Sequence, residues 1–452
     1  MSLFKKTVLL SLILLVQSVI CIFGAAAFWE SGYSGVIRQG ITVNGIPVGG
    51  LTPAQAVRKL ENNLSSPAEI KLQFTDAAAG KSHSVTLSEI DGKYDFPAIT
   101  EEVIKYSKKS LDFNQLLSAL TLMAAPPEIS LKITYDHEKL KQNIALIGEA
   151  WKEQPQNATV KISEQKVLLV PEVNGYRLDF ENTREKARLA LTRGVFNIAA
   201  SGRILKPDIT VSDLQGVDTL LSEFTTAYDG NAENRVHNIA LAGAAINGSV
   251  LKPEEIFSLN RQLGPRMEKS GYLKAPVIAN NRLTLDFGGG ICQVATTLYN
   301  AVLLAGLDIV ERFPHSQPVN YIPPGLDATI SGDHLDLKFA NNTDTPVYIA
   351  GLSDATTFTV RIFGGDKNHR HTIRITSEKQ LVAPRVTVMQ DDTLQEGETK
   401  VINPGRTGYQ VKVYREVLEE GRVVSKTLIS EDYYRPTNKI IHVGPGTEEL
   451  EK

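Results

Sequence analysis

The residue whose type and position could most directly do chemistry is Cys292, which follows three consecutive glycines, Gly288 to Gly290. The only other cysteine, Cys21, lies in an apolar N-terminal run, where we expect it to pack within a membrane. Cysteines in an oxidising compartment usually pair, so a single thiol outside the membrane needs an explanation. One explanation is a nucleophile, and the other is a buried small hydrophobe, the common fate of a free cysteine.

The residues after Cys292 predict a helix. Apolar side chains recur at helical spacing from 294 to 305, and Gly306 is a natural stop. Cys292 then lies in the first turn, where the helix dipole and free N–H groups favour a thiolate. The same N–H groups suit the oxyanion of an acyl-transfer reaction, although a glycine-rich turn into a helix is also common packing. The candidates for oxyanion or substrate binding are Gly289, Gly290 and Gln293.

A thiol nucleophile needs a base, and His315 is the best candidate because it lies only 315 − 292 = 23 residues downstream. His334 and His237 are the alternatives. A structural role for a lone histidine is equally compatible with the sequence. The region therefore predicts a cysteine–histidine pair without fixing which histidine takes part.

The base in turn needs a carboxylate to orient it. Asp327 is preferred over Asp333 and Asp336, and sequence separation does not decide among them. Arg312 could bind a substrate carboxylate with both arms of its guanidinium, and a surface salt bridge is the alternative. Eight histidines without metal-ligand spacing give no support for a metal, so no metal or cofactor is expected.

The elements that must position these residues follow an apolar N-terminus. Residues 7–28 are almost wholly apolar, which matches the ~20 residues that span a bilayer, and Lys5 and Lys6 precede them. We expect an uncleaved single-pass anchor, with the bulk of the chain outside the cell membrane. Acidic and basic residues nearly cancel, at 51 against 48, and no basic block occurs, which argues against a nucleic-acid partner.

The whole chain is expected to be a multidomain α+β protein. A motif at 87–92 is echoed at 170–175, each with strand-like flanks, which predicts two repeated α+β modules. Alternating residues and turn glycines after 386 predict a small all-β module for adhesion or spacing. The expected parts are an anchor and linker at 1–40, repeats at 41–125 and 126–210, a linker at 211–232, a loop-rich α+β domain at 233–365 and the β module at 380–446.

The central domain resembles the VanW family. The similarity covers about 130 residues and rests on motifs that occur in order, namely Asn234-Arg235, Ile256 to Asn260, Gly271-Tyr272, Gly288 to Ala301, Arg312 to Ser316, Pro324 to Thr329, Asp336 to Phe339 and Asn341-Asn342. The repeats look like the peptidoglycan-binding domains that often precede this domain, and the tail is similar to the G-five module. Ala295 and Phe313 depart from the residues common in the family.

The resemblance implies a cell-wall function. Some family members are regarded as cysteine-dependent L,D-transpeptidases, which implies that Cys292 is acylated by a peptidoglycan stem peptide and passes it to an amine. Other members are named vancomycin-resistance accessory proteins, a name that states no reaction. The leading hypothesis is therefore a membrane-anchored acyl transferase that cross-links stem peptides. The alternative is a non-catalytic wall-binding or scaffold protein that grips glycan or peptide.

Overall fold

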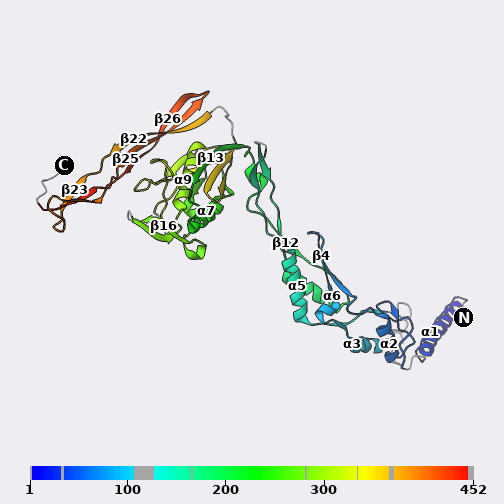
Figure 1. Cartoon of the computed structure of the whole chain (residues 1–452). Coiled ribbons are helices and arrows are strands. Elements are labelled where there is room, and N and C mark those ends of the chain that lie inside the picture. The colour runs from blue at the N-terminus through cyan, green and yellow to red at the C-terminus, as the bar shows by residue number, and fades with distance from the viewer. Residues whose placement is uncertain are drawn as a thin grey trace. The chain divides into compact units, whose positions relative to one another are not determined.

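The computed structural model describes residues 3–31, 35–105, 127–163, 166–279, 282–332, 334–365 and 371–445. Its helices and small sheets confirm the predicted α+β class (Figure 1). The chain divides into two compact units, of which the first holds 1–155 and 174–206 and the second 156–173 and 207–452. Asp333, a candidate carboxylate from the sequence, lies outside the described residues.

The N-terminal helix α1 (Leu3–Ser31) contains the predicted apolar segment. Its stretch Lys5–Ala25 has a mean hydropathy of 2.6 and is long enough to cross a membrane. A signal sequence near an N-terminus has the same length and composition. Its length and composition therefore fit either a membrane-spanning helix or a signal sequence.

Local sequence signals set the helices of the first unit. For example, α2 (Pro53–Asn63) begins with a proline behind Thr52, whose hydroxyl accepts a hydrogen bond from the N–H of Gln55. The Gln55 side chain in turn accepts from the N–H of Thr52 at 2.9 Å, which completes a capping box. The remaining elements are β1 (Thr42–Val43), β2 (Ile46–Pro47), β3 (Lys71–Asp76), β4 (Lys81–Thr86), η1 (Leu87–Ile90), β5 (Lys93–Tyr94), α3 (Phe96–Ile104), β6 (Glu128–Ile129), β7 (Ile133–Thr134), α5 (His137–Trp151), β10 (Gly175–Leu178), α6 (Phe180–Thr192), β11 (Asn197–Ala199) and β12 (Gly202–Leu205).

The predicted repeats at 41–125 and 126–210 are not separate bodies. One core joins Leu72 of β3 to Ile144 of α5 and Leu191 of α6, and β11 pairs in parallel with β3. The hairpin of the second copy, β8 (Thr159–Ser163) and β9 (Lys166–Val170), belongs to the second unit. A two-stranded hairpin cannot bury its own apolar face, so later helices and strands return to cover the first copy.

The centre of the second unit is a four-stranded antiparallel sheet in the order β13-β21-β20-β14. Its strands are β13 (Thr219–Ala227), β21 (Thr357–Gly364), β20 (Val347–Ser353) and β14 (Ser249–Leu251). Strand β13 lies in the predicted linker 211–232, which is a correction, because Phe224 pairs with Val360 of β21. The two buried residues of β13 are Ser222 and Thr226, so the segment looks polar in sequence.

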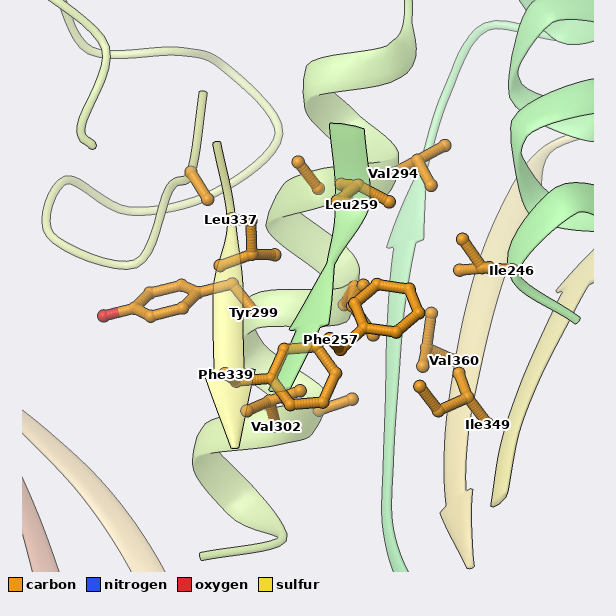
Figure 2. Packing of buried hydrophobic residues seen from close by; sticks show 14 of the residues in the cluster. Ile246, Phe257, Leu259, Val294, Tyr299, Val302, Leu337, Phe339, Ile349 and Val360 are labelled. Atoms are coloured by element: carbon orange, nitrogen blue, oxygen red, sulfur yellow. The ribbon is translucent and has the colours of Figure 1, made fainter. Parts of the chain in front are cut away.

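Helices α7 (Glu233–Ile246) and α9 (Ile291–Leu304) pack on this sheet. In Figure 2, Val294 and Val302 of α9 lie in the same cluster as Phe257 and Phe339, whose rings stack with centroids 5.0 Å apart. This core fixes α9 relative to the strands around it. The other elements of the domain are η2 (Val211–Leu214), β15 (Ile256–Ser258), α8 (Leu259–Leu263), η3 (Glu268–Ser270), β16 (Lys274–Ala279), β17 (Arg282–Phe287), β18 (Asp308–Glu311) and β19 (Lys338–Ala340).

The C-terminal module is all β, as predicted, and its first strand starts at 371 rather than after 380. Its sheets have the orders β22-β25-β26 and β23-β27-β24. Val411, Val413 and Tyr434 are buried together with Leu326 from the preceding domain, so the module packs against that domain. Its strands are β22 (His371–Val382), β23 (Val386–Gln390), β24 (Thr399–Asn403), β25 (Gly408–Glu419), β26 (Arg422–Tyr434) and β27 (Lys439–Val443).

Candidate functional site

Cys292 is the second residue of α9, in the first turn as predicted. Gly288 and Gly290 have φ angles of +79° and +112°, which side chains rarely adopt. The N–H of Ile291 donates to Gly288 O at 3.1 Å, and that of Gln293 donates to Gly290 O at 3.0 Å. The glycines therefore provide the tight turn that delivers the thiol to the helix N-terminus.

One face of α9 holds the segment that carries Asp327. Thr296 Oγ1 donates to Ala328 O at 3.1 Å and accepts from Ala328 N at 3.0 Å. One turn later, Asn300 Nδ2 donates to Leu326 O at 2.7 Å. Cys292, Thr296 and Asn300 are four residues apart, so their side chains lie on the same face of the helix. The helix that presents the thiol thus also fixes the segment with the carboxylate.

His315 and Asp327 meet because the segments around them run antiparallel, with Phe313 bridged to Thr329. His315 Nδ1 lies 2.6 Å from Asp327 Oδ2, and the same oxygen accepts from the backbone N–H of His315 at 2.7 Å. His315 and Cys292 line the same cleft, and the imidazole acts on the pKa of the thiol. The structure therefore brings together the three residues that the sequence nominated.

The half-buried thiol of Cys292 has further contacts on its other side. Its Sγ lies 3.4 Å from Thr329 Oγ1 and 3.6 Å from Ile330 O. Burial alone would raise the pKa of Cys292, but the hydrogen bond with His315 and the charge of that imidazolium lower it to about 7. The thiolate is therefore a major species at neutral pH.

The same contacts act on His315 and Asp327. Burial opposes the imidazolium, but the hydrogen bonds to Asp327 and Cys292 raise the pKa of His315 to about 9. Burial also opposes the Asp327 carboxylate, yet the bonds from the His315 side chain and backbone lower its pKa. A thiolate, an imidazolium and a carboxylate in sequence therefore coexist between about pH 7 and pH 9.

The second oxygen of Asp327 is held by the C-terminal module. The hydroxyl of Tyr434, at the end of β26, donates to Asp327 Oδ1 and accepts from the N–H of Gly325 at 2.6 Å. Tyr434 is fully buried, and Asp327 is 1% exposed. Each carboxylate oxygen of Asp327 is therefore occupied, one by His315 and the other by Tyr434.

Arg312 has a different role from the one proposed from sequence. Its side chain is 4% exposed, and Nη1 contacts both carboxylate oxygens of Asp432 at 2.6 Å. Its Nε donates to Asp327 O at 2.7 Å. The carboxylate that Arg312 contacts is thus Asp432 of β26 rather than one from a substrate, and Arg312 supports the backbone beside the site.

A cleft of about 700 Å³ opens beside Cys292, His315 and Gly290. Gly289 does not line it, because this residue is buried and an added Cβ would lie 2.8 Å from the backbone of Ala275. Gln293 borders the cleft but is 1% exposed, and its Nε2 donates to Thr226 Oγ1 and Ala227 O. It is therefore an anchor rather than a free donor.

The alternative base and acid candidates lie elsewhere. His237 is exposed and its Nε2 lies 2.9 Å from Gly271 O, and His334 is exposed as well. Asp336 accepts hydrogen bonds from Ser258 Oγ and the N–H of Asn260. Asp336 therefore caps the start of α8 and is not part of the cysteine group.

Sequence reasoning missed the polar neighbours of the site. The spacing of Thr296 and Asn300 from Cys292 was a usable signal, because residues four apart share a helix face. Nothing local pointed to Tyr434, which is 107 residues from Asp327.

The fold and site define a multidomain α+β protein with a cysteine and a histidine at one cleft and a buried carboxylate behind the histidine. Comparison with known families identifies its parts: the VanW like protein family matches residues 234–363, a peptidoglycan binding domain family matches 83–198, and the G5 domain family matches 373–446. The second match crosses the predicted boundary at 125, in agreement with the shared core.

Relatives lead to the same assignment. YoaR of Bacillus subtilis strain 168 is 33% identical over 233 residues, which cover 51% of this chain and 76% of YoaR. The vancomycin B-type resistance protein VanW of Enterococcus faecalis is 35% identical over 133 residues, or 28% of this chain and 48% of that protein. The chain belongs to the VanW family and carries a peptidoglycan-binding domain and a G5 domain.

Two solved G5 structures are similar to the C-terminal module. The crystal structure of HP0197-G5 is 24% identical, covering 16% of this chain and 97% of that one, with a TM-score of 0.13. The IgA1 protease G5 domain is 20% identical, covering 18% of this chain and 100% of that one, with a TM-score of 0.16. TM-scores this low do not support a structural assignment, so the G5 assignment rests on the family match.

Proposed function

We propose that this protein is a cysteine-dependent acyl transferase that cross-links peptidoglycan stem peptides, in the manner of an L,D-transpeptidase. The observation that carries the proposal is the Cys292 thiol at an open cleft together with His315, whose ring is hydrogen-bonded to Asp327. A nucleophile, a base and an orienting carboxylate in this arrangement support acyl transfer, whatever their order along the chain.

In the first half-reaction the Cys292 thiolate attacks the carbonyl carbon of a stem-peptide amide. A C–S bond forms and the carbonyl π electrons move to oxygen, which gives a tetrahedral intermediate. When the intermediate collapses, the C–N bond breaks and the leaving amine takes a proton from the His315 imidazolium. The raised pKa of His315 supports this role, because the ring still carries its proton at neutral pH.

In the second half-reaction the amine of a neighbouring stem attacks the thioester carbon. Neutral His315 accepts the amine proton, the new C–N bond forms, and the C–S bond breaks to regenerate the thiolate. Asp327 keeps Nδ1 of His315 in place throughout, so that Nε2 is the nitrogen that exchanges the proton. No group outside the chain and its two peptide substrates is required.

Two backbone N–H groups at the helix start suit the developing oxyanion. Gly290 and Cys292 both line the cleft, and among the described residues neither N–H has a hydrogen-bond acceptor. The neighbouring N–H groups of Ile291 and Gln293 are already used. Each well-placed donor contributes about 2.7–4 kcal/mol in measured cases. This refines the predicted set, because Gly289 is buried and does not line the cleft.

Binding to the wall without catalysis is the second candidate, and the peptidoglycan-binding family match at 83–198 favours it. Under either candidate we place the domains after α1 outside the membrane, with α1 as the anchor. The name of the Enterococcus faecalis relative, a vancomycin resistance protein, fits work on the cell wall. The two candidates differ only in whether Cys292 forms a covalent bond.

Muropeptides with tetrapeptide stems separate the candidates. The full chain in detergent, with Cys21→Ala so that Cys292 is the only thiol, is incubated with them and the products are analysed by mass spectrometry. We expect cross-linked dimers and a thioester adduct on Cys292, both absent after Cys292→Ala. Equal dimer formation by the two proteins would leave wall binding as the function, and retention on isolated cell walls would then measure it.

A further inference from the structure

Three arginines line the same cleft as the thiol. They are Arg235 from α7, Arg261 from α8 and Arg266 just after α8. Within the described lining, Asp286 is the single carboxylate that could balance them. An arginine guanidinium stays charged at any physiological pH, so the wall of the cleft carries excess positive charge.

The hydrogen bonds of these arginines all go to neutral oxygens. They are Arg235 Nη2 to Gln293 Oε1 at 2.7 Å, Arg261 Nη2 to Ile256 O at 3.1 Å, Arg266 Nη1 to Asn260 Oδ1 at 2.8 Å and Arg266 Nη2 to Gly332 O at 3.1 Å. Among the residues that the structure describes, no carboxylate forms an ion pair with any of the three. The contacts orient the guanidinium groups and leave their charge uncompensated.

Arg235 is coupled directly to the nucleophile's helix. Gln293, next to Cys292, accepts its bond from Arg235 and is itself fixed by Thr226 and Ala227. A buried amide therefore holds the cation beside the turn that presents the thiol. Positive groups in a cleft with low-dielectric walls concentrate anions there, and a guanidinium fork matches a planar carboxylate.

We propose that Arg235, Arg261 and Arg266 form a carboxylate-binding subsite, so that the preferred acyl donor is a peptide with a free carboxylate close to the amide that Cys292 attacks. This rests on the proposed acyl transfer and names its substrate class. It also transfers to the open cleft the role that sequence had given to Arg312, which is buried against Asp432.

A pair of small reagents tests the subsite without relying on catalysis. Iodoacetate and iodoacetamide alkylate the same thiol and have nearly the same size, but only iodoacetate carries a carboxylate. The Cys21→Ala full chain is treated with each reagent at pH 7.5 and low salt. The rate constant for iodoacetate divided by that for iodoacetamide is compared with the same ratio for a free cysteine peptide. We expect a ratio at least about 10-fold higher than for the peptide, falling as salt screens the charges.

Arginine variants then show whether these side chains cause the preference for iodoacetate. R235Q and R266Q should each lower the ratio by about 3- to 5-fold, the size of one close charge interaction in water, and R235K should lower it less. Lys252→Gln removes the same charge from an exposed position outside the cleft and should leave the ratio unchanged. The melting temperature of each variant checks the fold, and the iodoacetamide rate constant in the denominator of the ratio corrects for any change in the thiolate.

The outcomes separate the two proposals. A ratio equal to that of the free peptide, or one that R235Q and R266Q leave unaltered, overturns the subsite even if muropeptides are cross-linked. A raised ratio that the variants abolish supports the subsite even if no cross-linking occurs, in which case acyl transfer is the proposal that fails.

An independent observation concerns the C-terminal module, whose sequence suggested only adhesion or spacing. Strands β25 and β26 reach the site: Tyr434 bonds Asp327, Asp432 holds Arg312, and an added Cβ on Gly325 would lie 2.8 Å from Val411. We infer that this module positions Asp327, and through it His315, so that the G5 domain completes the site of the VanW domain.

Tyr434→Phe removes the donor to Asp327 and keeps the ring. With one oxygen released, Asp327 holds His315 less firmly, so acyl transfer should slow by about 10-fold and the alkylation midpoint of Cys292 should rise above pH 7. Tyr433→Phe, an exposed neighbour, is the matched control. A lower melting temperature with the midpoint still at pH 7 would mean that Tyr434 only stabilises the fold.

Discussion

The sharpest consequence of the site geometry is the effect of His315→Ala on the reactivity of Cys292. His315 is the main group that lowers the pKa of this thiol to about 7, against an ordinary value of 9.0, while burial pushes the other way. Without the imidazole the pKa should therefore return to 9 or higher. The reaction of iodoacetamide with Cys292 reports this directly, because only the thiolate reacts.

The magnitude follows from two opposing factors. At pH 7 a thiol of pKa 7 is about half ionised and one of pKa 9 about one-hundredth ionised, which favours the native protein by about 50-fold. A more basic thiolate is a better nucleophile. With a Brønsted coefficient of about 0.4–0.5 and a pKa difference of two, the thiolate of the variant reacts about 6- to 10-fold faster than the native thiolate. The variant should therefore react about 5- to 8-fold more slowly at pH 7.

The same arithmetic predicts that the two pH profiles cross. At pH 10 both thiols are mostly ionised, so the more basic thiolate of the variant should react about 6- to 10-fold faster than the native one. The crossing falls slightly above pH 8. Stopped-flow or quenched alkylation of the Cys21→Ala chain, followed by mass spectrometry of the Cys292 peptide, measures both limbs.

His334→Ala is the matched control, since that histidine is exposed and makes no contact with the thiol among the described residues. It should leave the native profile unaltered. Profiles for native protein and His315→Ala that share one midpoint would refute the argument, because the thiol would then not be paired with this imidazole.

Three further predictions concern the groups around this pair. Asp327→Asn should lower the pKa of His315 from about 9, so the high-pH limit of acyl transfer should move to lower pH in a rate profile; a limit that stays near 9 would contradict the role of the carboxylate. Gly289→Ala should reduce the free energy of unfolding in urea by about 1–3 kcal/mol, because its Cβ meets backbone that cannot yield. Thr296→Val should cost about 1–3 kcal/mol in the same assay by leaving the buried N–H of Ala328 without its acceptor, and a change below 0.5 kcal/mol would be evidence against this contact.

The pH window of the proposed acyl transfer follows from the same two groups. As pH rises through about 7 the Cys292 nucleophile appears, and as it rises through about 9 the His315 proton is lost. The ion pair that favours the first half-reaction therefore exists between these values. The expected profile is bell-shaped with apparent limits that belong to the pair rather than to either residue alone.

Much of the local structure could be predicted from the sequence. The glycines at 288–290 and the apolar spacing after them fix the start of α9 and place Cys292 in its first turn, since positive φ angles and helical periodicity are local properties. The helix at Pro53–Asn63 was predictable for the same reason, because its proline and capping residues adjoin it. His315 and Asp327 were nominated by residue type and proximity in sequence, and the fold brings them into contact.

Tertiary packing decided the rest. The returning helices α5 and α6 join both predicted repeats in one core, and β13 turns a predicted linker into a strand, because an apolar face is covered by whatever segment the fold brings to it. Arg312 could reach either a substrate or a carboxylate of its own chain, and only the approach of β26 selects Asp432. Residue types at a helix start determined where the Cys292 thiol lies, whereas contacts made across more than 100 residues, such as Tyr434 with Asp327, determined what holds its neighbours in place.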